Sequence, residues 1–238
     1  MTVVLDLESG AIVYVGQGKG VAALDPFWKR LRASHARIEA VATGMSAAYI
    51  RAVTDHLPDA QLVFDRFHIM KLFNDKLSAL RRELYREAAA GHAKNVLKGT
   101  RWLLLRNQEN LDDEKNEWDR LQEALELNHS LATAYYLKEE LRLLWEQESA
   151  WSAVGFLDAW CARARASGIR MLCTFADTLE NHRKGILAWY SFPISTGPLE
   201  GTNNKIKTLT KMAYGFRDEE YFRLKLYALH LTRYELVG

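Results

Sequence analysis

The residues best suited to chemistry lie close together near the carboxyl end of the chain, in residues 199–207. If a helix begins here, Glu200, Asn204, Lys207 and Lys211 share one face, because offsets of 0, 4, 7 and 11 residues align on a helix. A single acid among amides and cations is poorly suited to a core. It suits a surface that contacts phosphate groups, alone or together with a metal ion. An acid in the first turn of a helix also has a simpler explanation, since it complements the helix dipole.

A second candidate site is the sequence Asp-Arg-Phe-His at residues 65–68, where a predicted strand ends and a predicted helix begins. Ligand-binding groups gather at the carboxyl ends of strands in open α/β sheets, because the backbone turns away there and leaves a crevice. The alternative is that Asp65 and His68 bond to one another and only fix the turn.

The composition indicates a folded protein, and the charge distribution is uneven. The 238 residues are 48% apolar and 11% aromatic, and the net charge is only +2, so overall charge does not predict a nucleic-acid partner. Residues 81–106, however, carry seven lysines and arginines against two glutamates, and residues 109–126 reverse this sign. Such blocks are usually solvated helix faces, although a basic block can also contact phosphate.

Cysteine content and hydropathy predict a cytoplasmic protein. Cys161 and Cys173 are the two cysteines, and their spacing favours ordinary thiols over a zinc site or a disulfide framework. No apolar run approaches the length of about 20 residues that spans a bilayer, and no leader opens the chain.

The elements that must position the candidate residues change in character near residue 66. Strands are predicted at 1–7, 11–16, 38–42 and 61–64, with the first two joined as a hairpin. Helices are predicted between them, one with Asp25-Pro26 in its first turn and one that Ser46 caps and Pro58 ends. Hairpin, helix, strand, helix, strand implies an α/β fold with helices packed on a mixed sheet.

Residues 66–190 give almost no strand signal and predict a helical module. Tryptophans are scattered through it, and we expect them to pack between helices rather than to stack on bases; they include Trp102, Trp118, Trp145, Trp151 and Trp160. Two further helices are predicted, at 199–212 and from Asp218 to about Tyr234.

Four segments occur in an order that suggests a family. They are the Asp-Arg-Phe-His run at 65–68, Leu-Lys-Gly-Thr-Arg-Trp-Leu-Leu-Leu at 97–105, Glu-Gly-Thr-Asn-Asn-Lys-Ile-Lys at 200–207 and Ala-Tyr-Gly-Phe-Arg at 213–217. Together they resemble the DDE transposases of bacterial insertion sequences, in the ISL-type branch. The resemblance covers essentially the whole chain.

The resemblance implies a ribonuclease H-like mixed sheet, here without its first strand, interrupted by a large all-helical insertion and completed by a C-terminal helical segment. We therefore expect residues 1–68 to begin the catalytic core, 69–190 to form the insertion and 191–238 to complete the core.

The resemblance also implies an activity. Such enzymes cut DNA at the ends of the element and join the freed 3′-hydroxyls to target DNA, with three carboxylates holding two ions of Mg²⁺ or Mn²⁺. Glu200 matches the third acid and is the expected metal ligand. Asp65 and His68 match a segment near the active site, with positioning or DNA contact as the expected role.

The expected partners are DNA, both element ends and target, and further copies of this chain or a full-length transposase, in a nucleoid-associated cytoplasmic setting. The residues expected to contact DNA are Lys98, Arg101, Asn203, Asn204, Lys205, Lys207, Lys211 and Arg217.

Two departures from the family pattern bear on activity. Gly44 stands where the second aspartate is expected, and glycine has no metal-binding side chain. The first acid is expected on a strand before the hairpin, and Asp6, at the hairpin turn, is a poor replacement. We therefore predict impaired strand transfer. The alternatives are a non-catalytic DNA-binding relict that poisons the assembly of a full-length enzyme, and an unrelated helical scaffold without DNA affinity.

Overall fold

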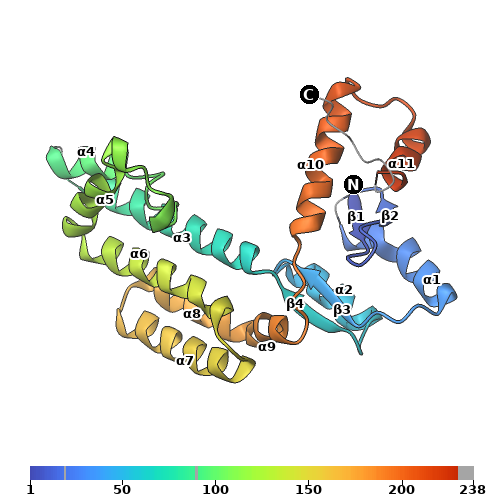
Figure 1. Ribbon diagram of the computed structural model, residues 1–238, viewed down its shortest axis with the longest axis horizontal. Helices are drawn as coiled ribbons and strands as arrows, with labels where there is room; N and C mark the ends of the chain where they lie inside the picture. The colour runs from blue at the N-terminus through green and yellow to red at the C-terminus, as the bar shows by residue number, and fades with distance from the viewer. Residues whose placement is uncertain (19, 89–90, 230–238) are drawn as a thin grey trace. The chain divides into compact units, whose positions relative to one another are not determined.

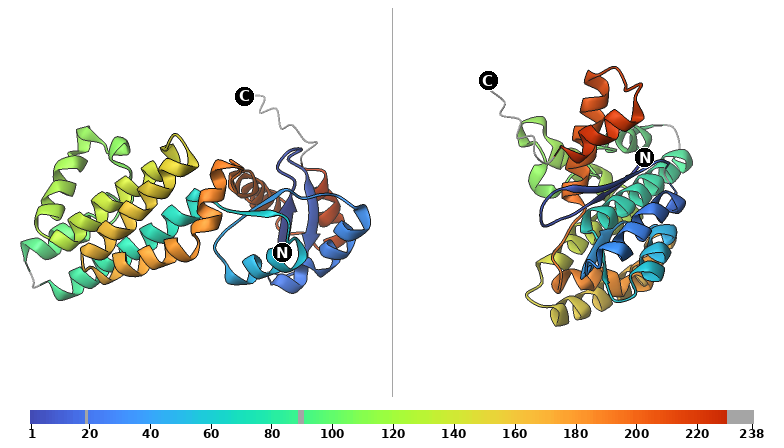
Figure 2. Two further views of the ribbon diagram at one scale, coloured as in Figure 1. Left: turned by 90° about the horizontal axis from the view of Figure 1, so that it is seen from below. Right: turned by 90° about the vertical axis from the view of Figure 1, so that its right-hand side faces the viewer.

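A computed structural model describes residues 1–18, 20–88 and 91–229 of the chain (Figures 1 and 2). It divides into two compact units, the first formed by Met1–Asp65 and Phe192–Gly238 and the second by Arg66–Ser191. The first unit holds every strand of the described residues, and the second is helical throughout. The helical character predicted for residues 66–190 is therefore confirmed.

The strands and helices of the first unit follow the predicted order. Its elements are β1 (Thr2–Leu5), β2 (Ile12–Gly16), η1 (Val21–Leu24), α1 (Asp25–Ser34), β3 (Ala40–Thr43), α2 (Ala47–His56), β4 (Gln61–Phe64), α10 (Gly197–Met212) and α11 (Glu219–Tyr227). Ser46 is at the N-cap of α2, and Asp218 caps α11 by accepting a hydrogen bond from the Tyr221 amide. The last predicted helix was expected to continue to about Tyr234, but residues beyond 229 lie outside the described part of the chain.

The strands pair as two separate sheets of two strands, not as one mixed sheet. β1 and β2 form an antiparallel hairpin, and β3 and β4 are parallel. Within the described residues, neither β1 nor β3 pairs with a third strand, which is why the two pairs stay separate. Mixed α/β character is thus confirmed, with small sheets and predominantly helical structure.

The turn of the hairpin uses the side chain of Asp6. Its carboxylate accepts hydrogen bonds from the Ser9 hydroxyl and from the backbone N–H groups of Glu8 and Ser9, and the first of these contributes most to lowering the pKa of Asp6. Gly10 follows with φ of 71°, a left-handed conformation that glycine adopts without strain. Asp6 is therefore engaged in fixing the turn.

Apolar clusters among the described residues join elements of the first unit. The hairpin packs against α10 and α11 through the buried residues Ile12, Val15, Ile206, Leu226 and Leu229. A second cluster joins Leu24, Trp28 and Ala52, and so connects η1, α1 and α2.

The second unit is built around four long helices, α3, α6, α7 and α8. Its elements are α3 (Arg66–Glu87), α4 (His92–Gly99), η2 (Gln108–Asn110), η3 (Asp113–Lys115), α5 (Glu117–Glu126), α6 (His129–Arg142), η4 (Leu143–Glu146), α7 (Ala150–Ala166), α8 (Arg170–Asn181), α9 (Arg183–Leu187) and η5 (Ala188–Tyr190). The rings of Phe73, Trp160 and Phe175 meet edge to face at its centre, with centroids 4.8–6.2 Å apart. The Trp160 indole donates a hydrogen bond to the Leu137 carbonyl at 2.9 Å, so this cluster ties all four helices together.

The expectation that the tryptophans pack between helices is right for some and wrong for two. Trp145 and Trp160 are buried, whereas Trp102 is 64% exposed and Trp151 86% exposed. Trp102 lies in a turn after α4, and Trp151 lies in the first turn of α7, where neither ring faces a neighbouring helix core. No helix among the described residues is both long and apolar enough to cross a membrane.

Candidate active site

The carboxyl ends of β3 and β4 lie side by side. In the parallel register Thr43 is opposite Phe64, so Gly44 and Asp65 follow the two strands at the same edge. This is the edge at which binding groups gather in α/β proteins. One of its two strand ends thus carries a carboxylate, and the other carries glycine, without a side chain.

Asp65 anchors the start of α10. Its side chain is almost fully buried, with 2% of the residue exposed, and its Oδ2 accepts a hydrogen bond from the Thr196 backbone N–H at 2.6 Å and another from the Thr196 hydroxyl. Thr196 is the residue before α10 and is also buried. A contact between residues 131 positions apart in the chain therefore fixes where this helix begins.

Glu200 lies in the first turn of α10 and is half-buried. Its backbone N–H bonds to the Thr196 carbonyl at 2.9 Å, so the same residue that binds Asp65 also begins the turn that carries Glu200. In the part of the chain that the structure describes, the Glu200 carboxylate has no ion pair. The helix dipole favours a negative charge at this position by about 0.3–1 kcal/mol.

The face that follows Glu200 along α10 is exposed and polar. Asn204, Lys207 and Lys211 are exposed on it, and Ile206 on the opposite side is buried against the hairpin. Lys205 is also exposed, Asn203 is half-buried, and Arg217 is exposed in the segment after the helix. Among the described residues none of these cations forms an ion pair, so their charges are available to an anion.

The remaining predicted residues belong to the second unit. His68 is half-buried in the first turn of α3, with its ring edge-on to that of Phe67. Lys98 is exposed in the last turn of α4, and Arg101 is exposed in the turn that follows. Asp65 and the start of α10 are thus brought together within the first unit, whereas His68, Lys98 and Arg101 are carried by the second.

The acids present do not fit a two-metal site. The described residues contain no group of three or more histidine, cysteine, aspartate or glutamate side chains that could hold a metal ion. Asp65 is bonded to Thr196, Asp6 is bonded within the hairpin turn, and Gly44 offers no ligand. Glu200 is left as a single carboxylate, which is too few for the metal set that the sequence resemblance implied.

Sequence reasoning missed Thr196. The signal was present, because Ser-Thr-Gly-Pro at 195–198 combines a capping residue with a proline suited to the first turn of a helix. What the sequence lacked was any indication that the partner of Thr196 is Asp65.

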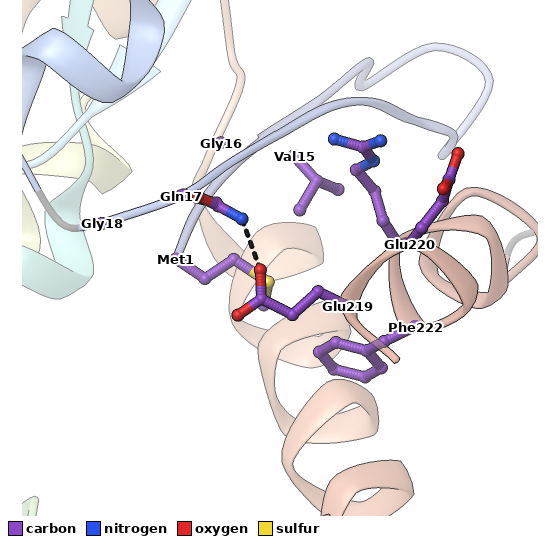
Figure 3. A pocket seen from close by; sticks show the side chains of 9 residues that line it. Met1, Val15, Gly16, Gln17, Gly18, Glu219, Glu220 and Phe222 are labelled. Atoms are coloured by element: carbon purple, nitrogen blue, oxygen red, sulfur yellow. Dashed lines mark hydrogen bonds between the residues drawn. The ribbon is translucent and has the colours of Figure 1, made fainter. Parts of the chain in front are cut away.

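The hollow shown in Figure 3 lies elsewhere in the first unit. It has a volume of about 530 Å³ and is lined by the end of the hairpin and by α11, including Val15, Gln17, Glu219 and Phe222. The Gln17 amide donates a hydrogen bond to the Glu219 carboxylate across it. None of the predicted site residues lines this hollow.

Comparison with known proteins identifies the class as transposases. A family model described as a transposase, of the ISL3-type DDE group, matches residues 1–226. The chain is 38% identical over 231 residues to the transposase for insertion sequence element IS1001 of Bordetella parapertussis, which covers 95% of this chain and 56% of that protein. It is 29% identical over 243 residues to the transposase for insertion sequence element IS1557 of Mycobacterium tuberculosis, covering 92% of this chain and 54% of that protein.

The chain belongs to the ISL3-type DDE transposase family. It spans about half the length of the curated relatives it matches. No solved structure shows significant similarity to it.

Proposed function

We propose that the chain forms part of the catalytic core of an insertion-sequence transposase, that it binds DNA, and that alone it is impaired in metal-dependent cleavage and strand transfer. The observation that carries this proposal is the arrangement of α10 within a chain of this family. The helix presents Glu200 in its first turn, lysines along the same face, and a start that Asp65 fixes to a strand end. DNA, at element ends and at the target, is the proposed partner.

The proposed fold is ribonuclease H-like. It is supported by an antiparallel hairpin followed by a parallel strand pair, with β1 and β3 each paired on one side only within the described residues. A further strand between β1 and β3 would join the two sheets into the mixed sheet of that fold. The helical insertion proposed for residues 69–190 covers nearly the same stretch as the second unit.

The exposed lysines of α10 are proposed to contact phosphate. In water, attraction to a distant carboxylate contributes little free energy to an ammonium group. A lysine that neutralises a DNA phosphate contributes more, because it releases condensed counterions from the DNA. Lys207 and Lys211 lie one turn apart on the face that carries Glu200, which suits successive contacts along one strand.

Salt dependence tests this proposal. We expect the double variant Lys207→Ala/Lys211→Ala to bind a short fluorescein-labelled duplex more weakly, with the slope of log affinity against log salt reduced by about 0.9 for each phosphate that is no longer neutralised. Fluorescence anisotropy at several salt concentrations measures both quantities. Lys29→Ala, an exposed lysine of α1, is the matched control and should leave the slope unchanged. An unchanged slope in the double variant would show that these lysines do not bind phosphate.

Mg²⁺ (or Mn²⁺) remains the proposed cofactor of the family's enzymes, although the described residues of this chain contain no group of three or more side chains that could hold it. The same observation favours a second candidate function, a non-catalytic chain that binds DNA or joins the assembly of a full-length transposase. Binding to DNA that is indifferent to Mg²⁺, together with reduced transposition when the chain is mixed with a full-length enzyme, would distinguish this function from an active core.

A further inference from the structure

Trp102 is an exposed tryptophan flanked by buried residues. It is 64% exposed, yet Thr100, Leu103 and Leu104 on either side are 3%, 3% and 1% exposed. The buried Lys138 ammonium donates hydrogen bonds to the Leu104 carbonyl at 2.9 Å and the Arg106 carbonyl at 2.7 Å, which fixes the turn that carries Trp102. The indole is therefore exposed to solvent on a turn whose neighbouring residues are buried and whose backbone is hydrogen-bonded.

Arg101 lies beside this ring, and Arg81 is close enough to Arg101 and Arg82 for their like charges to act on it. The Arg101 guanidinium lies 4.7 Å from the centre of the Trp102 ring. Arg81, on α3, donates a hydrogen bond to the Leu97 carbonyl at 2.8 Å, and its pKa is lowered first by burial and then by the like charges of Arg101 and Arg82. We call these four residues, Arg81, Arg82, Arg101 and Trp102, the arginine–tryptophan patch.

Five arginines of the second unit have carboxylate partners, whereas the arginines of the patch, like the exposed Arg66, Arg86, Arg120 and Arg170, have none within the described residues. Arg106 pairs with Glu117, Arg142 with Glu109, Arg163 with Glu140, Arg165 with Glu180 and Arg183 with Asp158. Within the described ranges, by contrast, none of the three arginines of the patch forms an ion pair. Like charges held together without a counter-ion are unfavourable, and an anionic ligand would relieve the repulsion.

The combination of an exposed indole with unpaired guanidinium groups matches one ligand chemistry. Nucleobases stack on aromatic rings, and guanidinium groups bind the flanking phosphates in a bidentate manner. In a fully paired duplex the bases are already stacked on one another, so an indole gains nothing from them. An unpaired base has a free face to offer.

We propose that the arginine–tryptophan patch binds DNA at an unpaired base, which stacks on the Trp102 indole while its flanking phosphates contact Arg81, Arg82 and Arg101. This inference rests on the proposed function, because it assumes that the chain is a DNA-binding protein. It adds that the second unit prefers unpaired bases to paired ones. It also adds that Trp102 is the residue responsible for this preference.

The test compares three labelled oligonucleotides with the full chain: a single strand, a paired duplex, and the same duplex with one unpaired base replaced by fluorescent 2-aminopurine. We expect the unpaired base to be quenched on binding, and Trp102→Ala to lose roughly tenfold or more in affinity for unpaired DNA while keeping its affinity for the duplex. Trp102→Phe should retain most of the preference, because it keeps an aromatic face. Trp151→Ala is the matched control, since Trp151 is 86% exposed in the same unit and belongs to none of the patch contacts.

The outcomes separate this inference from the proposed function. Duplex binding by the wild-type chain without any preference for the unpaired base, or a preference that survives Trp102→Ala in a variant that melts like the wild type, overturns the inference alone. Equally weakened binding in Trp102→Ala and Trp151→Ala also overturns it. A wild-type chain that binds none of the three oligonucleotides at low salt overturns the proposed function as well. A protein partner for the patch predicts that all three oligonucleotides bind alike in every variant, which would overturn the inference too.

Discussion

The contact between Asp65 and Thr196 shows how one residue pair can determine where a helix begins. A buried carboxylate needs donors, because an unpaired one loses its hydration without replacement. Thr196 supplies two donors, its backbone N–H and its hydroxyl. Removing either partner should therefore destabilise mainly the start of α10, where Glu200 lies.

We predict that Thr196→Val weakens the first turn of α10. The substitution keeps the shape of the side chain and removes the hydroxyl donor, and hydrogen bonds to charged groups contribute about 1.5–3 kcal/mol. Amide hydrogen exchange of residues 197–201 should become faster, which reports a lower free energy of local opening. Asp65→Asn should act in the same direction, and Asp59→Asn, at an exposed aspartate, should not. Unchanged exchange in Thr196→Val would rule out this role for the hydroxyl.

A second prediction at this scale concerns the thiol of Cys161. Burial, the largest cause, raises the pKa of Cys161 to about 11. The thiolate is the reactive form, so a raised pKa lowers the reactive fraction near pH 8. Alkylation followed by mass spectrometry should find Cys161 protected in the folded protein and reactive after unfolding, and the half-buried Cys173 modified first. Equal rates for both thiols in the folded protein would contradict this assignment.

At the scale of elements, α10 is positioned by its apolar side as well as by its first turn. Ile206 is 5% exposed and packs in the cluster that joins the hairpin to α10 and α11. We predict that Ile206→Ala lowers the free energy of unfolding of the first unit by about 2–5 kcal/mol, because it removes buried methyl groups and leaves a cavity. Urea unfolding measures the change. Leu224→Ala in α11 is the control, since Leu224 is 61% exposed, and a similar decrease in both variants would mean that this packing is not what holds the helix.

Short-range signals made most elements predictable from sequence. Short apolar runs placed the hairpin and β4 to within about two residues, Ser46 placed the start of α2, and the helical offsets of Glu200, Asn204, Lys207 and Lys211 are consistent with α10. These features depend on neighbours in the chain. The pairing of Asp65 with Thr196 depends on residues 131 positions apart, which no local pattern encodes.

The exposed tryptophans were mispredicted for a related reason. Hydrophobicity alone favours burial of an indole, and it is right for Trp145 and Trp160. Exposure of Trp102 follows from the turn after α4, whose backbone Lys138 holds from a different helix. The basic character of residues 81–106 was visible in the sequence, but the absence of carboxylate partners for the arginines of the arginine–tryptophan patch, within the described ranges, required the structure.

At the scale of the whole molecule, membership of the transposase family indicates a catalytic metal site, whereas the acids of the described residues do not form one. The family match extends over residues 1–226, and α10 keeps the acid and the lysines that the resemblance assigns to the site. The strand end beside Asp65 carries Gly44, and the described residues contain no cluster of acids that could hold a metal ion. We therefore expect this chain to bind DNA without catalysing strand transfer.

The most direct test of binding without catalysis is a strand-transfer assay on labelled DNA that carries the ends of the element. The assay contains Mg²⁺, and DNA binding is measured in the same samples. We predict that the chain alone binds this DNA and yields no joined product. Introducing Gly44→Asp into a protein that also contains a strand carrying the first acid should raise the yield. Robust joined product from the chain as it stands would show that binding and catalysis are not separated.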